Sequence, residues 1–270
     1  MSTDSEGPET DWDDASDDAA DTYGPDDGLL VIENLTKRFG GLTAVDDLSF
    51  AVEEGEILGF IGPNGAGKST TFDCVTGTYR PTSGTVWYRG EDVTGVATHQ
   101  LVGRGLARTF QSFRPLRDRT VVGNVTLALT PDRLFSLSGL RGTTRQRAVE
   151  MCERVGLGDR LHQTPSELPH AGMLRLELAR ALATDPDLLL VDEPFAGLAG
   201  SEVAELSELF ESLRQEGITL VVVDHNMRGL LSLIDRAVVI QFGAKIAEGT
   251  PEEIRDDPTV QEAYLGGDGL

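Results

Sequence analysis

The feature that most constrains this chain is a glycine-rich octapeptide between a predicted strand and a predicted helix. The segment Gly62-Pro63-Asn64-Gly65-Ala66-Gly67-Lys68-Ser69 fits the pattern G-x-x-x-x-G-K-[ST] in full. It follows the predicted strand 57–61 and precedes a helical stretch from Thr70 onward. Glycines let backbone N–H groups turn inward around an anion, and a helix N-terminus adds a positive dipole end. The segment therefore predicts a phosphate-binding loop, in which Lys68 reaches the β- and γ-phosphates and Ser69 binds Mg²⁺.

An acidic pair at the end of an apolar run is the second motif. The run Leu188-Leu189-Leu190-Val191 predicts a buried strand, and Asp192 and Glu193 follow it directly. In an open α/β sheet this end of a strand lies in the ligand crevice. Asp192 is placed to hold Mg²⁺, directly or through water, and Glu193 to act as general base on the attacking water. Alone, such a pair is typical of a surface turn; beside a phosphate loop the functional interpretation is favoured.

A histidine and a glutamine carry weaker signals. His225 lies just past the predicted buried strand 218–223, where its side chain can contact a γ-phosphate and orient water. A loop histidine with ordinary hydrogen-bond partners is the alternative. Gln111, in the segment Arg108-Thr109-Phe110-Gln111, indicates little by itself.

The charge of the chain is strongly negative. There are 45 acids and 23 bases, for a formal charge of −22, which excludes nucleic-acid binding by bulk positive charge. Residues 1–28 hold eleven of the acids and no base, which predicts a disordered acidic tail; an acidic docking arm is the alternative. Outside that tail, 34 acids and 23 bases leave −11, a composition typical of halophilic proteins.

The arginines are distributed unevenly along this acidic chain. Residues 98–160 hold eleven arginines and five acids, a local charge of +6. Such a region either faces an anionic lipid surface or an acidic partner, or its arginines pair locally with acids. Cys74 and Cys152 are too few for a disulfide scaffold, and the histidines show no metal-ligand spacing. No apolar run approaches the roughly 20 residues that span a bilayer, and no secretory signal begins the chain.

Short apolar runs alternate with helical patterns along the rest of the chain. This alternation predicts an α/β fold with a mostly parallel sheet covered on both faces. Residues 85–88 follow the turn Pro81-Thr82-Ser83-Gly84 and predict an antiparallel strand instead. Ser201 is a predicted cap for a helix that ends near Gly217 and buries one face, formed by Val203, Leu206, Phe210 and Leu213.

These motifs, in this order, resemble those of the ATP-binding subunits of ABC transporters over residues 29–266. The opening Thr36–Val45, the segment Arg108–Gln111 and the ending near Gly249–Pro251, Asp257-Pro258 and Ala263–Gly266 are most similar to branched-chain amino-acid importers. The resemblance implies a P-loop NTPase (ABC ATPase) core with a mostly parallel sheet, an antiparallel β subdomain and a helical subdomain inserted at about 112–165. Residues 267–270 are then the C-terminal end.

The resemblance also implies roles for residues. Residues 62–70 bind the nucleotide, Phe39 stacks on adenine, and Ser69, Gln111 and Asp192 hold Mg²⁺, with Gln111 linking that site to a transmembrane partner. Glu193 and His225 are the catalytic pair. Phe39 is equally consistent with a core position.

The implied function is ATP binding and hydrolysis coupled to solute uptake at the cytoplasmic face of the membrane, with ATP and Mg²⁺ as cofactors. The implied partners are transmembrane permeases, a second ATP-binding subunit and a solute-binding protein. The alternatives are a urea-import ATPase, a lipid or lipopolysaccharide export ATPase, and a soluble ABC ATPase without a transport role. An unrelated phosphate-loop kinase or GTPase is less favoured, because a long helical insertion separates Lys68 from Asp192.

The chain departs from the family where the signature Leu-Ser-Gly-Gly-Gln is expected. Ungapped alignment places Leu168-Pro169-His170-Ala171-Gly172 there. Pro169 lacks both the serine hydroxyl and a backbone N–H, and Ala171 adds a Cβ where a backbone is expected to approach phosphate. Because its own phosphate loop, Glu193 and His225 are intact, the chain is expected to work best in a heterodimer whose partner supplies an intact signature.

Overall fold

The apolar runs fold into two separate sheets. The structure, a computed structural model, describes residues 23–109, 115–129 and 141–264, and the side chains of 141–143 are not described. A six-stranded sheet has the order β10-β9-β3-β8-β7-β6, and a four-stranded sheet the order β2-β1-β4-β5. The strands are β1 (Leu30–Phe39), β2 (Leu42–Val52), β3 (Ile57–Ile61), β4 (Ser83–Tyr88), β5 (Glu91–Asp92), β6 (Leu106–Arg108), β7 (Leu188–Asp192), β8 (Thr219–Val223), β9 (Arg236–Gln241) and β10 (Ala244–Gly249).

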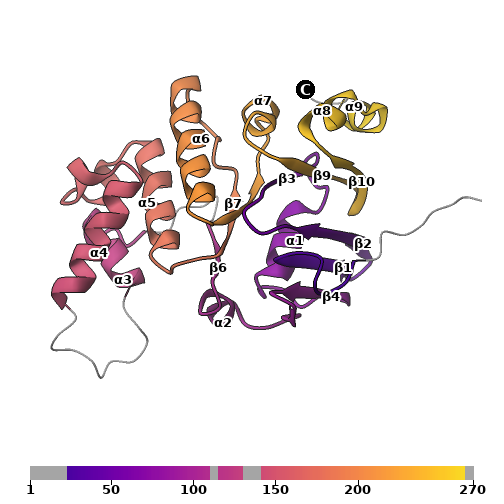
Figure 1. Cartoon of the computed structure of the whole chain (residues 1–270), viewed down its shortest axis with the longest axis horizontal. Coiled ribbons are helices and arrows are strands. Elements are labelled where there is room, and N and C mark those ends of the chain that lie inside the picture. Colours follow the sequence, from indigo (N-terminus) through magenta and orange to yellow (C-terminus); the bar gives the residue numbers. More distant parts are fainter. Residues whose placement is uncertain (1–22, 110–114, 130–140, 265–270) are drawn as a thin grey trace, which may run out of the picture.

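Helices surround the larger sheet and extend beyond it (Figure 1). They are α1 (Lys68–Val75), α2 (Thr98–Val102), α3 (Val121–Ala128), α4 (Arg141–Arg154), α5 (His170–Leu182), α6 (Gly200–Gln215), α7 (Met227–Leu231), α8 (Pro251–Asp256) and α9 (Pro258–Tyr264), with the 3-10 turns η1 (Gly158–Arg160) and η2 (Pro165–Glu167). Within these described residues, no helix is both long and apolar enough to cross a bilayer.

The larger sheet confirms the predicted α/β fold. Strands β9, β3, β8, β7 and β6 run parallel, and only the edge strand β10 pairs antiparallel, with β9. The predicted antiparallel strand at 85–88 lies in β4, which pairs antiparallel with β1 in the four-stranded sheet. The mostly parallel sheet and the antiparallel unit are therefore both present.

Side-chain alternation divides the core between the two faces of the larger sheet. On β3, Ile57 and Ile61 belong to a cluster shared with α3–α7, whereas Leu58 and Phe60 belong to a cluster shared with β1, β2 and α1. Because successive strand residues point to opposite faces, one apolar run supplies both clusters. The sheet is thus covered on one side by helices and on the other by α1 and the antiparallel unit.

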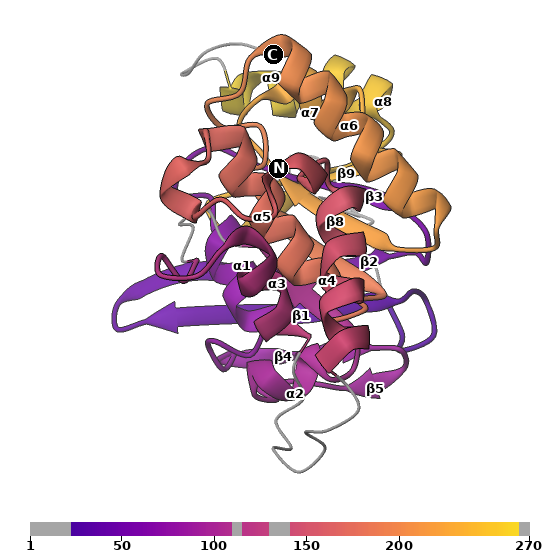
Figure 2. The ribbon, with the colours of Figure 1, turned by 90° about the vertical axis from the view of Figure 1, so that its left-hand side faces the viewer.

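The helices expected between residues 112 and 165 are α3 and α4, and α5 packs against both. They gather at one end of the molecule, opposite the antiparallel unit (Figures 1 and 2). Buried Val121, Val125 and Cys152 join their apolar faces. This grouping agrees with an inserted helical unit, whose boundaries stay a prediction because residues 110–114 and 130–140 lie outside the described part.

The start of α6 differs from the prediction. The helix begins at Gly200, so Ala199 is the N-cap residue and Ser201 lies inside the helix. The Glu202 carboxylate accepts a hydrogen bond from the Ala199 N–H at 2.9 Å, which replaces the expected serine cap. Three of the four residues of the predicted face, Leu206, Phe210 and Leu213, are buried, and Val203 is half-buried.

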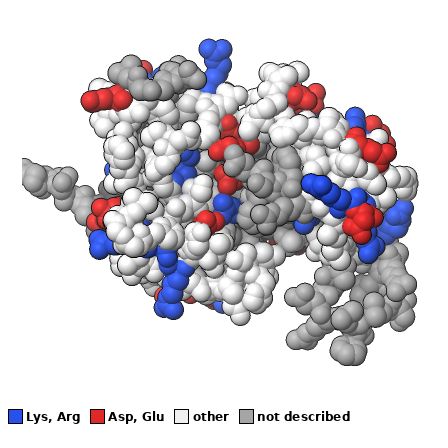
Figure 3. All heavy atoms as spheres, turned by 180° about the vertical axis from the view of Figure 1, so that it is seen from behind, with Lys and Arg blue, Asp and Glu red and all other residues white. Residues whose placement is uncertain are grey.

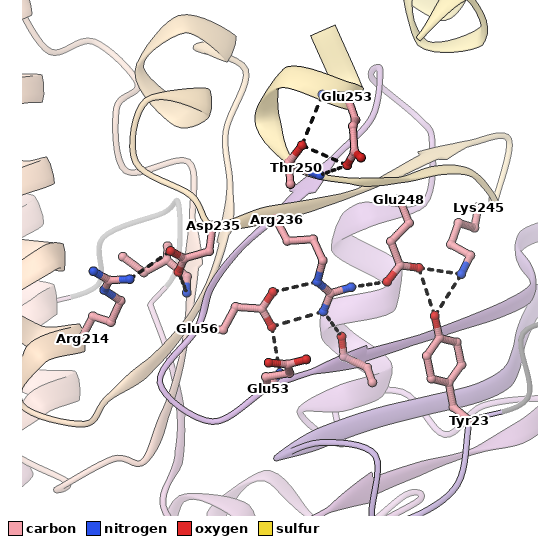
Figure 4. A network of polar contacts seen from close by, with 12 residues as sticks. Tyr23, Glu53, Glu56, Arg214, Asp235, Arg236, Lys245, Glu248, Thr250 and Glu253 are labelled. Carbon is pink, nitrogen blue, oxygen red and sulfur yellow. Dashed lines mark hydrogen bonds and ion pairs between the residues drawn. The ribbon is translucent and has the colours of Figure 1, made fainter. Parts of the chain in front are cut away.

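The last residues of the segment assigned to the acidic tail are folded onto the body. Tyr23 donates a hydrogen bond to Glu248 at 3.1 Å, and Lys245 Nζ lies 5.2 Å from the Tyr23 ring centre. Glu248 also pairs with Arg236, which contacts Glu56 at 2.9 Å (Figure 4). Contacts with Lys245 and Glu248 on β10 therefore hold Tyr23 against the folded body, which composition alone does not predict. Residues 1–22 lie outside the described part.

Local pairing accounts for part of the basic region. Arg104 pairs with Glu91 at 2.9 Å, Arg154 with Glu216, and Arg108 with two carboxylates discussed below. The face drawn in Figure 3 likewise shows basic and acidic side chains intermingled. These contacts favour the local-pairing interpretation for the arginines they involve.

Candidate functional site

The phosphate loop connects β3 to α1, as the sequence predicts. A Cβ on Gly62 would lie 2.4 Å from the Ile240 carbonyl oxygen, and one on Gly67 would lie 2.4 Å from that of Ala44. Gly67 also has φ of 110°, in the left-handed region. Glycine is therefore required at both ends of the loop by neighbouring backbone.

Lys68 is buried at the base of this loop, with 7% of its surface exposed. Its ammonium group donates hydrogen bonds to the carbonyls of Gly62, at 2.5 Å, and Pro63, at 3.0 Å. Burial lowers the pKa of Lys68, while the nearby Glu193 and Asp192 carboxylates act in the opposite direction. The cation is thus held at the centre of the loop, where a phosphate chain would neutralise it.

Glu193 and His225 meet across two neighbouring strands. Glu193 follows β7 and His225 lies two residues beyond β8, and their side chains approach to 3.0 Å between Oε1 and Nε2. The backbone of Glu193 has φ of 49°, and its N–H donates to the Val223 carbonyl at 2.7 Å. The two predicted catalytic residues are therefore in direct contact.

A buried carboxylate holds the loop that carries His225. Asp224, 4% exposed, accepts hydrogen bonds from the backbone N–H groups of Phe195 and Asn226, each at 2.7 Å. Burial raises the pKa of Asp224, and these two hydrogen bonds oppose that rise. Asp224 precedes His225 in the sequence, but its bridge between the ends of β7 and β8 depends on tertiary contacts that the sequence does not indicate.

A cavity of about 530 Å³ joins these groups. Its walls come from the phosphate loop and α1, from the acidic strand end, and from two hairpins; they are Leu42, Thr43, Ala44, Asn64–Thr70, Glu193, Val223, His225 and Phe242. The volume suits a nucleotide-sized ligand. Backbone donors, a buried lysine and a carboxylate–histidine pair thus face one space, which is the arrangement that phosphoryl transfer to water needs.

Two hairpins complete the cavity and were missed by reasoning from motifs. The turn between β9 and β10 lies against the loop, where Gly243 N–H donates to the Ala66 carbonyl at 2.9 Å. Phe242 precedes it, with φ of 50° and 84% of its surface exposed. Leu42, 66% exposed, opens β2 on another wall. An exposed phenylalanine with a left-handed backbone can be recognised only in the folded chain, because neither property can be read from the sequence.

Phe39 lies beside the cavity rather than in its wall. Its ring packs edge-on against Tyr79 with centroids 5.2 Å apart, and Lys37 Nζ lies 4.9 Å from the Phe39 ring centre. Phe39 is 40% exposed, so it is not a core residue. Its contact with adenine stays a prediction.

Of the predicted magnesium ligands, Ser69 lies in the cavity wall and Asp192 does not. Asp192 ends β7 with its carboxylate bonded to Arg108 at 2.9 Å. Gln111 lies outside the described residues. Among the described residues no group of three or more His, Cys, Asp or Glu side chains is arranged to hold a metal. A hydroxyl and a carboxylate with room for phosphates still fit Mg²⁺, which binds through few protein oxygens and retains water.

The altered signature forms the start of α5. Pro169 is the N-cap residue, and His170 begins the helix with its ring nitrogen Nε2 3.0 Å from the Ala196 carbonyl oxygen. Leu168 and Gly172 are buried, whereas Pro169 is exposed and Ala171 is half-buried. All five are described, and none of them lines the cavity of this chain.

The last described residue also reaches the phosphate loop. The Tyr264 hydroxyl, at the end of α9, forms a hydrogen bond with the backbone of Gly62, and burial raises the pKa of this phenol. In the sequence, Tyr264 stands out only through the resemblance of residues 263–266 to branched-chain amino-acid importers. In the structure, the Tyr264 side chain contacts the first glycine of the phosphate loop.

Comparison with known proteins agrees with this architecture. A family model described as ABC transporter matches residues 45–196, and one described as branched-chain amino acid ATP-binding cassette transporter matches 244–269. The chain is 41% identical to the high-affinity branched-chain amino acid transport ATP-binding protein LivG of Salmonella typhimurium, over 88% of this chain and 98% of that protein. It is 34% identical to the lipopolysaccharide export system ATP-binding protein LptB of Haemophilus influenzae, over 88% and 97%.

Solved structures show the same fold. The ADP conformation of MJ1267, an ATP-binding cassette of an ABC transporter, superposes with a TM-score of 0.79 at 30% identity, over 88% of this chain and 99% of that one. A dimeric post-hydrolysis state of the cassette MJ0796 bound to ADP and Pi gives 0.73 at 26% identity, over 82% and 98%. The predicted family is confirmed: this chain belongs to the ATP-binding, ATP-hydrolysing cassettes of ABC transporters.

Proposed function

We propose that this chain is the ATP-hydrolysing subunit of an importer for branched-chain amino acids. Two findings support the solute class: the family model that matches residues 244–269, and the higher identity to LivG than to the lipopolysaccharide-export relative. Separate permeases supply the membrane path, and a solute-binding protein supplies selectivity. The chain then works at the cytoplasmic face of the membrane as a peripheral subunit.

The contact between Glu193 and His225 at the cavity wall carries the proposed chemistry. The loop N–H groups and Lys68 bind the β- and γ-phosphates and stabilise the charge that develops on them. Glu193 accepts the proton of the attacking water, and His225 orients both that carboxylate and the γ-phosphate. Ser69, Asp192 and Gln111 would hold Mg²⁺, which would neutralise charge at the phosphates.

The chain is further proposed to pair with a second, different cassette. The phosphate loop and the Glu193–His225 pair are complete, whereas Pro169 and Ala171 remove a donor and add a Cβ at the signature. In a face-to-face dimer the partner's signature would close this chain's competent site. The opposite site would bind ATP and turn over slowly.

Two substitutions test the ATPase assignment. Lys68→Ala removes the cation that binds the phosphates, and we expect it to abolish ATP binding. Glu193→Gln keeps the shape of the side chain and removes the base, so we expect retained binding, at least 100-fold slower hydrolysis, and a trapped nucleotide-bound dimer on gel filtration. Glu208→Gln, an exposed carboxylate on α6, is the matched control. An active Glu193→Gln protein would contradict the assignment of the base.

The transport assignment needs a separate measurement. With the permeases and the solute-binding protein in one membrane, ATP hydrolysis should be stimulated by leucine, isoleucine or valine and not by urea. Stimulation by urea, or by a lipid substrate alone, would favour the urea-import or export alternatives while leaving the ATPase assignment intact.

A further inference from the structure

One buried arginine joins the helix of the phosphate loop to the strand of the magnesium candidate. Arg108, the last residue of β6, has 7% of its side chain exposed. Its Nη1 donates to Asp73 on α1 at 2.6 Å, and its Nη2 donates to Asp192 on β7 at 2.9 Å. The guanidinium also lies 5.3 Å from the ring centre of Phe72. The Arg108 guanidinium thus connects β6, α1 and β7, which lie far apart in the sequence.

The hydrogen bond from Arg108 constrains the orientation of the Asp192 carboxylate. The Asp192 side chain is 11% exposed, and its Oδ2 accepts from Arg108. A planar guanidinium presents donors in a fixed fork, so it can hold two carboxylates at a set angle, which a lysine ammonium does not do. The bond to Arg108 fixes Oδ2, and a metal or a metal-bound water would then bind through Oδ1.

We propose that Arg108 is a positioning residue for the magnesium site, holding the Asp192 carboxylate in its metal-binding orientation and linking it to α1 through Asp73. The proposal rests on the proposed function, because it assumes that Asp192 serves Mg²⁺. Residues that orient metal ligands typically change metal affinity by about 10- to 100-fold when they are removed. An ion pair that only fastens α1 to the sheet would change stability instead.

The test measures how the two contacts of Arg108, with Asp73 and with Asp192, affect nucleotide binding, and it does not depend on ATP hydrolysis. A fluorescent ATP analogue is titrated in EDTA and in Mg²⁺, and the ratio of the two dissociation constants reports the gain due to magnesium. For Arg108→Met we expect that gain to fall about tenfold, with the affinity in EDTA changed less than about twofold. For Asp73→Asn, which keeps an oxygen acceptor and leaves the Asp192 arm in place, we expect a lower melting temperature but a wild-type gain. Arg104→Met, which breaks an exposed pair with Glu91, is the matched control for loss of an arginine.

The outcomes separate the possible roles. Equal loss of the magnesium gain in Arg108→Met and Asp73→Asn, or a wild-type gain in Arg108→Met, would overturn the proposal and leave a structural ion pair. Should Arg108→Met fail to fold, Arg108→Lys decides, because its ammonium lacks the fork; we expect at least a threefold smaller gain, and a wild-type gain would overturn the proposal. Absence of any nucleotide binding by the wild-type chain would instead refute the proposed function.

Discussion

Glu193 occupies a backbone conformation that a glutamate rarely adopts, and its neighbours hold it there. Its φ of 49° lies in the left-handed region, which costs a non-glycine residue about 1–2 kcal/mol. The N–H bond to Val223 and the contact with His225 compensate for this cost. Such strain turns the carboxylate out of the strand direction and into the cavity, a use of local strain that is common at functional sites.

Pro169 and Ala171, which replace signature residues, are expected to slow ATP hydrolysis by the chain alone. Pro169→Ser with Ala171→Gly restores a hydroxyl, a backbone N–H and room for phosphate, so the purified chain alone should hydrolyse ATP about tenfold faster than the wild type. The measurement is steady-state ATPase activity against protein concentration, with Ala204→Gly, an exposed helical site, as control.

The wild-type chain should then be slow alone and fast with its partner cassette. Vigorous hydrolysis by the wild-type homodimer would contradict the idea that the altered signature requires a heterodimer. Equal rates for the wild type and the repaired chain would show that Pro169 and Ala171 leave the composite site unimpaired.

Among the elements, the hairpin between β9 and β10 supports the phosphate loop from outside the motif. Gly243 donates to Ala66, and the Gly243 carbonyl accepts from the Asp46 N–H, both at 2.9 Å. One turn thus joins the edge of the large sheet, the start of β2 and the apex of the loop. The Tyr264 hydroxyl adds a second support below Gly62.

A pair of glycine substitutions measures that support. Gly243→Ala and Gly217→Ala place a Cβ at nearly equal φ, 90° and 93°, so each should lower the free energy of unfolding by about 1–2 kcal/mol. A Cβ on Gly243 also lies 3.0 Å from the Ala44 oxygen, whereas one on Gly217 meets nothing within 4 Å. We expect ATP affinity to fall several-fold in Gly243→Ala only. Denaturant unfolding and ATP titration give the two readouts, and equal affinities would contradict a coupling of hairpin and loop.

For the molecule as a whole, the charge of −22 means that repulsion among acidic side chains exceeds the attraction from the bases. Ion pairs such as that between Arg236 and Glu56 reduce this repulsion locally, and Tyr23, the first described residue, bonds to Glu248 in the same network (Figure 4). The remaining excess of acids spreads over the surface, where salt screens it. The proposed high-salt adaptation follows from this excess rather than from any single site.

Salt should therefore stabilise the folded chain. Between about 0.1 and 1 M KCl the screening length falls from roughly 10 Å to roughly 3 Å, and we expect the melting temperature to rise by several degrees. A chain starting at Tyr23, which lacks nine of the acids, should keep most of that rise, because its charge is still −13. A melting temperature that is flat or falls with KCl would contradict the proposed adaptation.

Features that depend on neighbours along the chain could be predicted from the amino-acid sequence. The loop 62–69 carries its glycines and lysine in one octapeptide, and the buried strands are short apolar runs bounded by polar residues or glycine. The helix face of Leu206, Phe210 and Leu213 follows from a period of 3.6 residues. These features are local, so a pattern was enough to find them.

Which of these segments lie next to one another could be learned only from the folded chain. The order β3-β8-β7 puts the phosphate loop, His225 and Glu193 on adjacent strands, and neither strand order nor the contact at 3.0 Å can be read from spacing. The bridge from Arg108 to Asp73 and Asp192 spans 35 and 84 residues of sequence. Contacts of this kind depend on how faces of the sheet are covered, because burial and charge pairing are properties of the assembled core rather than of any segment.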